Sequence, residues 1–271
     1  MLKKRLIPVL LLRNGIIVQS KGFKRYQNLG TPTAAVERLS SWASDELIYL
    51  DISQNPEYDL RRDDLNHPQL GSIVEIVNLI AAKCYMPLTF GGGIRTIEDI
   101  RVRLGGGADK VTINTLALES PEFITEAAEQ FGSQCIVVSI DVKQTESGKR
   151  VYKGGRTPTE WEPIQWAKEV ASLGAGEILL NSIDRDGSGS GYDLELVESV
   201  SRAVHVPVIA MGGAGNLTHV ADAMNSSVSA VAVANMFHYT ENSVYNAKKF
   251  LYEQKLNVRN PGQLNKENRN L

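Results

Sequence analysis

The sequence predicts a (β/α)8 barrel of the TIM type, built from two related halves. Short apolar runs alternate with helix-like stretches along the 271 residues, and two glycine clusters, 91–93 and 212–215, each follow such a run. Their starts differ by 212 − 91 = 121 positions, close to half of the chain. Alternation predicts a parallel sheet, and eight units with a twofold repeat predict a closed barrel. A doubly wound open sheet is the alternative.

The predicted strands are short apolar runs, and the segments between them have apolar residues at helical spacing, as in 121–131 and 161–173. We expect a single barrel domain over 1–259, with halves of about 1–125 and 126–259, followed by a polar tail, 260–271. A long polar loop over 54–71 should follow the second strand. The eight predicted strands are 6–12, 47–51, 88–91, 110–113, 136–141, 178–181, 208–211 and 230–234.

Two further pairs of similar segments support the twofold repeat. Residues 46–51 resemble 177–182, and residues 108–114 resemble 228–235. Glycines between a strand end and a helix start leave backbone N–H groups free to hold an anion, and the helix dipole assists them. Two such cradles in related halves suggest a phosphorylated small molecule with a phosphate at each end.

The bulk properties fit an enzyme of the cytoplasm. A net charge of −2 gives no electrostatic reason to expect nucleic acid or membrane binding. The basic start is followed by an apolar run interrupted by Pro8, which favours a strand and turn over an export signal. Cys84 and Cys135 are expected to be reduced core residues. No metal or cofactor is expected, because the histidines have no metal-ligand spacing; they are His67, His205, His219 and His238.

Active sites of this barrel class lie at the C-terminal ends of the strands. Asp141 ends an apolar strand, where a carboxylate must be paired or functional, so we expect a functional role over a structural cap. Asp51 could equally cap a helix or hold a site residue in place without contacting the ligand. The polar loop 182–187 contains Asp184, Arg185 and Asp186. It could cover the open C-terminal end of the barrel, or these residues could only stabilise the conformation of the loop. The other residues at these ends are Leu11, Asn114, Thr115, Asn181, Gly187 and Asn235.

Four charged residues lie at the opposite ends of four strands. Arg5 precedes the first strand, Glu46 the second and Glu177 the sixth, and Lys110 begins the fourth. If the four side chains point inward together, they form a ring of ion pairs, which is costly to bury unless mutually paired. Such a ring could be a plug or a gate.

Motifs along the chain, from about Leu2 to Arg259, resemble the cyclase subunit of imidazole glycerol phosphate synthase. They include Leu6-Ile7-Pro8, Asp45-Glu46-Leu47, Phe90-Gly91-Gly92-Gly93-Ile94, Ala108-Asp109-Lys110-Val111, Ile113-Asn114-Thr115, Phe131-Gly132-Ser133-Gln134, Gly174-Ala175-Gly176-Glu177-Ile178, Ser182-Ile183-Asp184-Arg185-Asp186-Gly187, Gly212-Gly213-Ala214-Gly215 and Asn257-Val258-Arg259.

The resemblance implies a glutaminase partner at the barrel bottom, with Asp109 on the docking surface. Ammonia would pass the charged gate and travel along the barrel to a bisphosphorylated aminoimidazole-carboxamide ribonucleotide, yielding imidazole glycerol phosphate and the carboxamide by-product. The implied substrate-side residues are Asp51, Asn181 and Asp186. The implied phosphate-binding residues are Gly92, Gly93, Asn114, Thr115, Gly187, Gly212, Gly213 and Asn235.

The resemblance fails at the acid–base pair. The family uses two aspartates; one corresponds to Asp141, and the other position holds Leu11, which cannot transfer a proton. Losing a positioned acid or base costs on the order of 10²–10⁴-fold in rate. A family lysine aligns with Gln19, although Lys21 is close by. Met211 and Asn235 replace smaller polar residues.

This pattern resembles the paralogous branch found beside sugar-amidating enzymes of surface-polysaccharide synthesis. We therefore expect an ammonia-conducting barrel with little or no cyclase activity, which passes ammonia to a sugar amidotransferase. A histidine-pathway cyclase that tolerates Leu11 is the second hypothesis. A sugar-phosphate isomerase is a third, for which the charged ring would have no purpose.

Overall fold

The computed structural model describes residues 2–21, 25–41, 44–53, 72–238 and 243–262. The predicted loop over 54–71, including His67, lies outside the described residues, and so does most of the predicted tail.

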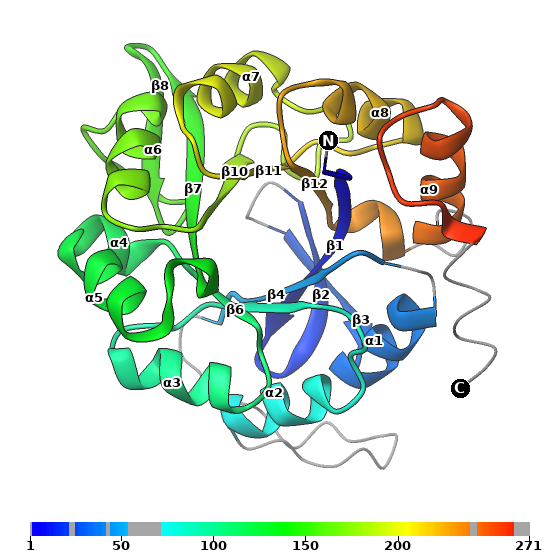
Figure 1. Cartoon of the computed structure of the whole chain (residues 1–271), viewed down its shortest axis with the longest axis horizontal. Coiled ribbons are helices and arrows are strands. Elements are labelled where there is room, and N and C mark those ends of the chain that lie inside the picture. The colour runs from blue at the N-terminus through cyan, green and yellow to red at the C-terminus, as the bar shows by residue number, and fades with distance from the viewer. Residues whose placement is uncertain (1, 22–24, 42–43, 54–71, 239–242, 263–271) are drawn as a thin grey trace.

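A closed barrel of eight parallel strands forms the centre of the described chain, with helices around it (Figure 1). The ring order is β1, β4, β5, β6, β7, β10, β11 and β12, and pairing of β12 with β1 closes it. The predicted (β/α)8 fold is therefore confirmed. The barrel strands are β1 (Arg5–Arg13), β4 (Leu47–Asp51), β5 (Leu88–Gly91), β6 (Lys110–Ile113), β7 (Ile136–Thr145), β10 (Glu177–Ser182), β11 (Val208–Met211) and β12 (Ala230–Val233).

The helices begin at local sequence signals. At α3, Thr96 and Asp99 form a reciprocal capping box, in which each side chain accepts from the other's backbone N–H. At α8, the Asn216 side chain accepts from the His219 N–H. The helices are α1 (Pro32–Ser41), α2 (Ile73–Ala81), α3 (Ile97–Gly105), α4 (Thr115–Glu119), α5 (Glu122–Phe131), α6 (Pro163–Ser172), α7 (Leu194–Ala203), α8 (Leu217–Asn225) and α9 (Val244–Glu253), with 3₁₀ turns η1 (Ser133–Cys135) and η2 (Asn235–His238).

Two antiparallel extensions at the C-terminal end of the barrel are absent from the sequence prediction. Strands β2 (Ile16–Lys21) and β3 (Arg25–Gly30) continue from β1, while β8 (Gly148–Lys153) and β9 (Thr157–Pro158) continue from β7. The first extension begins at Asn14-Gly15, where both residues have positive φ, 50° and 78°. Asn-Gly with two positive φ angles is the preferred two-residue hairpin turn, so the sequence did carry a signal for it.

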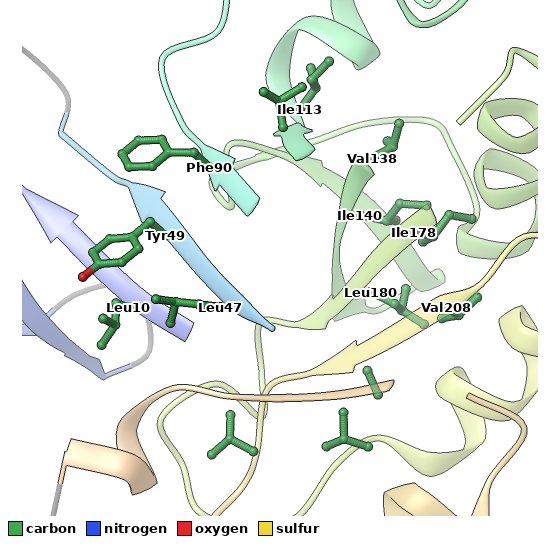
Figure 2. Close-up of a cluster of buried hydrophobic side chains, with 14 of the residues drawn as sticks. Leu10, Leu47, Tyr49, Phe90, Ile113, Val138, Ile140, Ile178, Leu180 and Val208 are labelled. Atoms are coloured by element: carbon green, nitrogen blue, oxygen red, sulfur yellow. The ribbon is translucent and has the colours of Figure 1, made fainter. Parts of the chain in front are cut away.

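The core has two separate apolar clusters because alternate strand residues face opposite sides of the barrel wall. On β1, Leu10 belongs to the cluster beneath the helices, whereas Val9 and Leu11 belong to the smaller one inside the barrel. Figure 2 shows part of the outer cluster, in which Tyr49 and Phe90 stack with ring centroids 5.9 Å apart. The alternation determines which side chains can reach the barrel mouth.

Strands β5 and β6 and the helix between them repeat in the second half with a constant offset of 120 residues. Strand β5 corresponds to β11 at 208 − 88 = 120, α3 to α8 at 217 − 97 = 120, and β6 to β12 at 230 − 110 = 120. Gly92 and Gly93 therefore correspond to Gly212 and Gly213, and Gly91 corresponds to Met211. The first glycines of the two clusters, 121 positions apart, are not equivalent, because Gly91 is the last residue of β5 whereas Gly212 follows the end of β11.

Candidate functional site

A cavity of about 320 Å³ lies at the C-terminal ends of the barrel strands. It brings together most of the residues predicted for this end of the barrel. Those that line it are Leu11, Asp51, Gly92, Gly93, Asn114, Thr115, Asp141, Asn181, Asp186 and Met211.

Asp141 is buried at this mouth and held by two amides. Asn181 Nδ2 donates to Asp141 Oδ1 at 3.0 Å, and Asn114 Nδ2 donates to Asp141 Oδ2 at 3.3 Å. Burial raises the pKa of the Asp141 carboxyl to about 6, although the bond from Asn181 opposes the shift. Such a carboxyl can exchange a proton near neutral pH, as a general acid or base requires.

Asp186 brings a second carboxyl to the same cavity. Burial, and then the charge of Asp141, raise the pKa of Asp186 to about 7. The rest of its loop has a structural role: Asp184 Oδ2 accepts from the Gln144 N–H at 2.7 Å, and Arg185 donates to the Ser190 carbonyl at 3.2 Å. Of the three charged residues predicted in this loop, only Asp186 lines the cavity.

Leu11 occupies the position in the first half that Asp141 occupies in the second. Leu11 pairs with Leu50 of β4, and Asp141 pairs with Asn181 of β10. Leu50 and Asn181 correspond in the repeat (50 + 131 = 181), so Leu11 and Asp141 correspond as well. The equivalence means that the barrel presents one carboxyl where twofold symmetry would present two.

The two candidate replacements for the missing family lysine do not line the cavity. Gln19 and Lys21 lie on one face of β2, and Ser20 between them lies on the other face and lines the cavity. Asp51 lines the cavity, and its Oδ1 accepts from the Ser53 N–H at 2.9 Å, so within the described residues it orders the chain directly after β4 and caps no helix.

The first glycine loop opens onto the cavity. Gly92 and Gly93 have φ angles of +98° and +64°, in the left-handed region where glycine is favoured. A Cβ at Gly92 would lie 2.0 Å from the Asp51 carbonyl oxygen, so the close approach of these backbones also requires glycine. Asn114 and Thr115, at the start of α4, line the same wall.

The second glycine loop is not part of the cavity lining, and neither are Gly187 and Asn235. The loop is covered instead: the Gly191 N–H donates to the Gly213 carbonyl at 2.8 Å, and a Cβ at Gly213 would lie 2.1 Å from the Gly191 oxygen. Asn235 Nδ2 donates to the Ser20 carbonyl at 2.5 Å.

Sequence reasoning missed several lining residues on the antiparallel extensions. Ser20 and Tyr26 come from the first extension, and Gly154 and Arg156 come from the turn between β8 and β9. The Gly154 N–H donates to Asn114 Oδ1 at 2.8 Å, which fixes this turn to the barrel wall. The sequence signal that could have predicted this hairpin is Gly154-Gly155-Arg156, a glycine-rich turn within a stretch of alternating polar and apolar residues.

The N-terminal ends of the strands carry a ring of alternating charges. Arg5 donates to Glu46 at 2.6 Å and to Glu177, and Lys110 donates to Glu177 at 2.9 Å and to Glu46 at 3.3 Å. The side chains of Arg5 and Lys110 are 20% and 19% exposed, against 9% and 6% for the two glutamates. The structure thus brings together all four residues singled out in the sequence.

Exposed side chains surround this ring. Asp109, directly before β6, is exposed, and its Oδ2 accepts from the Leu88 N–H at 2.8 Å. Leu2, before β1, and Tyr85, before β5, are 93% and 91% exposed. Both exposed apolar side chains lie at the same end of the barrel as the charged ring.

Within the described residues, no group of three or more His, Cys, Asp or Glu side chains is placed to hold a metal ion. In the same part of the chain, none of the helices has the length and apolar character needed to cross a membrane.

Comparisons with known proteins point to one family. Residues 5–243 match the family model described as "Histidine biosynthesis protein". The imidazole glycerol phosphate synthase subunit HisF of Anoxybacillus flavithermus is 45% identical over 263 residues, which cover 96% of this chain and 100% of that protein. The subunit of the same name from Alkaliphilus metalliredigens is 42% identical over 262 residues, with the same coverage of both chains.

Proposed function

The chain belongs to the histidine biosynthesis protein family, as a relative of the imidazole glycerol phosphate synthase subunit HisF, and within that family we propose that it is an ammonia-conducting barrel subunit with little or no cyclase activity. Its partner would be a glutaminase that docks at the N-terminal ends of the barrel strands. Ammonia released there would pass the charged ring and leave at the mouth.

The observation that carries the proposal is Leu11 in the wall of the mouth. Leu11 and Asp141 line one cavity at equivalent positions of the two halves, so a cyclase that needs a carboxyl at both positions lacks one of them. A leucine side chain has no titratable proton, and nothing in its immediate pairing replaces it, because Leu50 and Val18 lie beside it. The expected rate loss is on the order of 10²–10⁴-fold.

The charged ring supports continued ammonia traffic. Replacing a buried ionic cluster by apolar residues is often neutral or stabilising, so a plug would have no need of four charges. The exposed Leu2, Tyr85 and Asp109 around the ring support docking of a partner at the same end. Both relatives are named as subunits of a synthase, which is consistent with a multi-chain complex.

We further propose that the acceptor of the ammonia is a separate sugar amidotransferase of surface-polysaccharide synthesis. The support is indirect: a barrel that keeps the ring but lacks the acid–base pair must deliver its ammonia to chemistry done elsewhere. A neighbouring set of polysaccharide genes would support this acceptor, and a set of histidine genes would oppose it.

The test is a cyclase assay of the purified chain with ammonium salts and the bisphosphorylated aminoimidazole-carboxamide ribonucleotide, beside a family cyclase that has both aspartates. We expect turnover at least about 10²-fold below that of the comparison enzyme. The variant L11D should raise any residual rate only if the rest of the cavity accepts the substrate. Turnover close to that of the comparison enzyme would refute the proposal.

A second candidate is a histidine-pathway cyclase that uses Asp186 in place of the missing aspartate. The observation in its favour is that Asp141 and Asp186 both line the cavity with pKa values raised to about 6 and about 7. In that case D186N would abolish the turnover of the purified chain, whereas it would leave ammonia delivery to a separate acceptor intact.

A further inference from the structure

We propose that the C-terminal end of the barrel docks an acidic face of the enzyme that accepts the ammonia, and that this face binds cations on both antiparallel extensions. The inference rests on the proposed function, because a barrel that delivers its ammonia elsewhere needs a partner at the end where the ammonia leaves. The observation that carries it is a pair of cations facing each other across each extension, Lys21 with Arg25 and Lys143 with Arg150.

The first extension places two exposed cations directly opposite each other. Lys21 of β2 is the register partner of Arg25 of β3, and both side chains are exposed. Arg13, at the end of β1, is also exposed, and its guanidinium lies over the Tyr26 ring, 4.5 Å from the centroid. Residues 13–21 and 25–30 contain no acidic side chain. Like charges directly opposite on neighbouring strands are destabilising, so this pairing weakens the extension.

The second extension repeats the unfavourable pairing. Lys143 of β7 is the register partner of Arg150 of β8. Lys143 is exposed, with its Nζ 5.8 Å from the centroid of the Tyr152 ring. Residues 143–156 contain five cations and a single acidic residue, Glu146. Because the whole chain has a net charge of −2, these cations are concentrated at one end of the barrel and do not reflect a generally basic surface.

The protein neutralises only some of these cations. Within the described residues, Lys21, Arg25 and Lys143 have no ion pair with an acidic side chain. A chain selected for stability alone would place opposite charges across the strands, so the cation pairs indicate a binding surface. The ion pairs on the second extension are Lys149 with Asp193 at 2.8 Å, Arg150 with Glu162 at 3.4 Å and Lys153 with Glu119 at 2.9 Å.

The two cation pairs belong to opposite sides of the barrel mouth. The extensions continue from β1 and β7, which three strands separate in either direction around the closed ring. None of the four cations lines the cavity. Ser20 and Tyr26, which do line it, lie on the other face of the first extension from Lys21 and Arg25. A ligand held in the cavity therefore does not account for the cations, whereas a partner surface laid across the mouth would meet both pairs.

Charge complementarity and the chemistry of ammonia both favour an acidic protein face as the occupant. Ammonia that escapes into water is protonated, and ammonium has no lone pair with which to attack an acceptor. A partner seated on both extensions would cover the exit and limit this loss. Carboxylates on that partner would relieve the like-charge pairing on each extension, and complementary charge would also speed association and make it sensitive to salt.

The experiment is calorimetric titration of the full-length chain, in complex with its glutaminase, with the sugar amidotransferase encoded in the same gene cluster. We expect the Kd to rise about 10-fold when the salt concentration is raised from about 50 mM to about 300 mM. K21E and K143E should each weaken binding about 10-fold. The double variant should weaken it about 100-fold, because effects at separate sites add in free energy.

Thermal unfolding separates docking from a structural role. K21E places a glutamate opposite Arg25, and K143E places one opposite Arg150, so each variant replaces a like-charge pair by an opposite-charge pair. The Tm should therefore stay the same or rise while the affinity falls. K168E is the matched control, because Lys168 is exposed on α6, away from the extensions, and it should change the Kd by less than about twofold.

Wild-type affinity in K21E and K143E, an effect at one extension only, or a lower Tm in both variants would overturn the proposal. So would binding of phosphatidylglycerol vesicles that both variants abolish, if the amidotransferase itself does not bind. The cyclase assay tests the proposed function separately. Negligible turnover with wild-type affinity in both variants would remove the docking surface alone, whereas full turnover with charge-dependent docking would remove the ammonia-delivery role alone.

Discussion

The two halves of the barrel share a backbone but present different chemistry at the mouth. The first half contributes the open glycine loop with Arg103 behind it, and it places Leu11 where a carboxyl could stand. The second half contributes Asp141 and Asp186 and covers its own glycine loop. The two halves thus have equivalent strands, and single side-chain differences leave the open glycine loop in one half and the buried carboxyls in the other.

The opposite end of the barrel combines the halves instead of separating them. Glu46 and Glu177 are counterparts in the repeat (46 + 131 = 177), but both cations of the ring come from the first half. The counterpart of Lys110 is Ala230 (110 + 120 = 230). The first half therefore supplies both positive charges of the ring, and each half supplies one of its two glutamates. The four charges balance.

The largest loss of stability is expected from breaking the buried ion pair that joins α9 to the segment before β4. Lys248 of α9 is fully buried and pairs with Asp45 at 2.8 Å, whereas the second-half counterpart of Asp45 is Gly176 (45 + 131 = 176). K248M would leave the buried Asp45 carboxylate with only the exposed Arg259, at 3.9 Å, as an ion partner, and should lower the free energy of unfolding by about 3 kcal/mol. Urea denaturation would measure it. The neighbouring K249M, in an exposed pair, should cost under about 1 kcal/mol; equal losses would mean that the anchor is unimportant.

A smaller effect is expected at the charged ring. K110M leaves Arg5 to neutralise two glutamates and should lower the free energy of unfolding by about 2 kcal/mol, below the range for fully buried pairs because Lys110 is partly exposed. In the reconstituted glutaminase complex, the ratio of glutamine consumed to aminated product should rise. K83M removes a cation from an exposed pair and serves as control. An unchanged ratio in K110M would leave the ring without a role in transport.

The smallest effect concerns the pH dependence that Asp141 introduces in the second half. Its pKa is raised from 3.8 to about 6 by burial, so between about pH 4 and pH 6 the unfolded chain loses this proton first. The stability contributed by the protonated form is therefore complete below about pH 4 and is lost as the pH rises through 6.

D141N should remove this loss and raise the free energy of unfolding at pH 8, relative to pH 4, by about 1–2 kcal/mol compared with the parent chain. The figure is below the full value for the shift because the carboxyl of the unfolded chain, with its ordinary pKa of 3.8, is already partly ionised at pH 4. D222N, at an exposed position on α8, should leave the pH profile as it is. A parallel profile in D141N would show that Asp141 is ionised without cost.

The sequence by itself determined the barrel and the position of each barrel strand along the chain, although β7 continues to Thr145, beyond its predicted end at 141. Apolar runs such as 88–91 and 208–211 coincide with β5 and β11, because a strand buried on both faces has to be continuously apolar. The predicted strand ends placed Asp141 and Asp51 at the C-terminal end of the barrel and the four ring charges at the N-terminal end. This was possible because the position of a residue along a parallel strand determines the end of the barrel at which it lies.

Only the tertiary structure decided which glycine loop is open and which groups surround it. Arg103 reads in the sequence as one of several arginines on an amphipathic helix, and its burial depends on how α3 lies against the barrel. Arg156 reaches the cavity through a hairpin extension that the strand pattern did not predict. The covering of Gly213 by Gly191 depends on a contact between two separate loops. Local sequence encodes the period and ends of elements, whereas contacts between distant segments depend on packing, which no local pattern records.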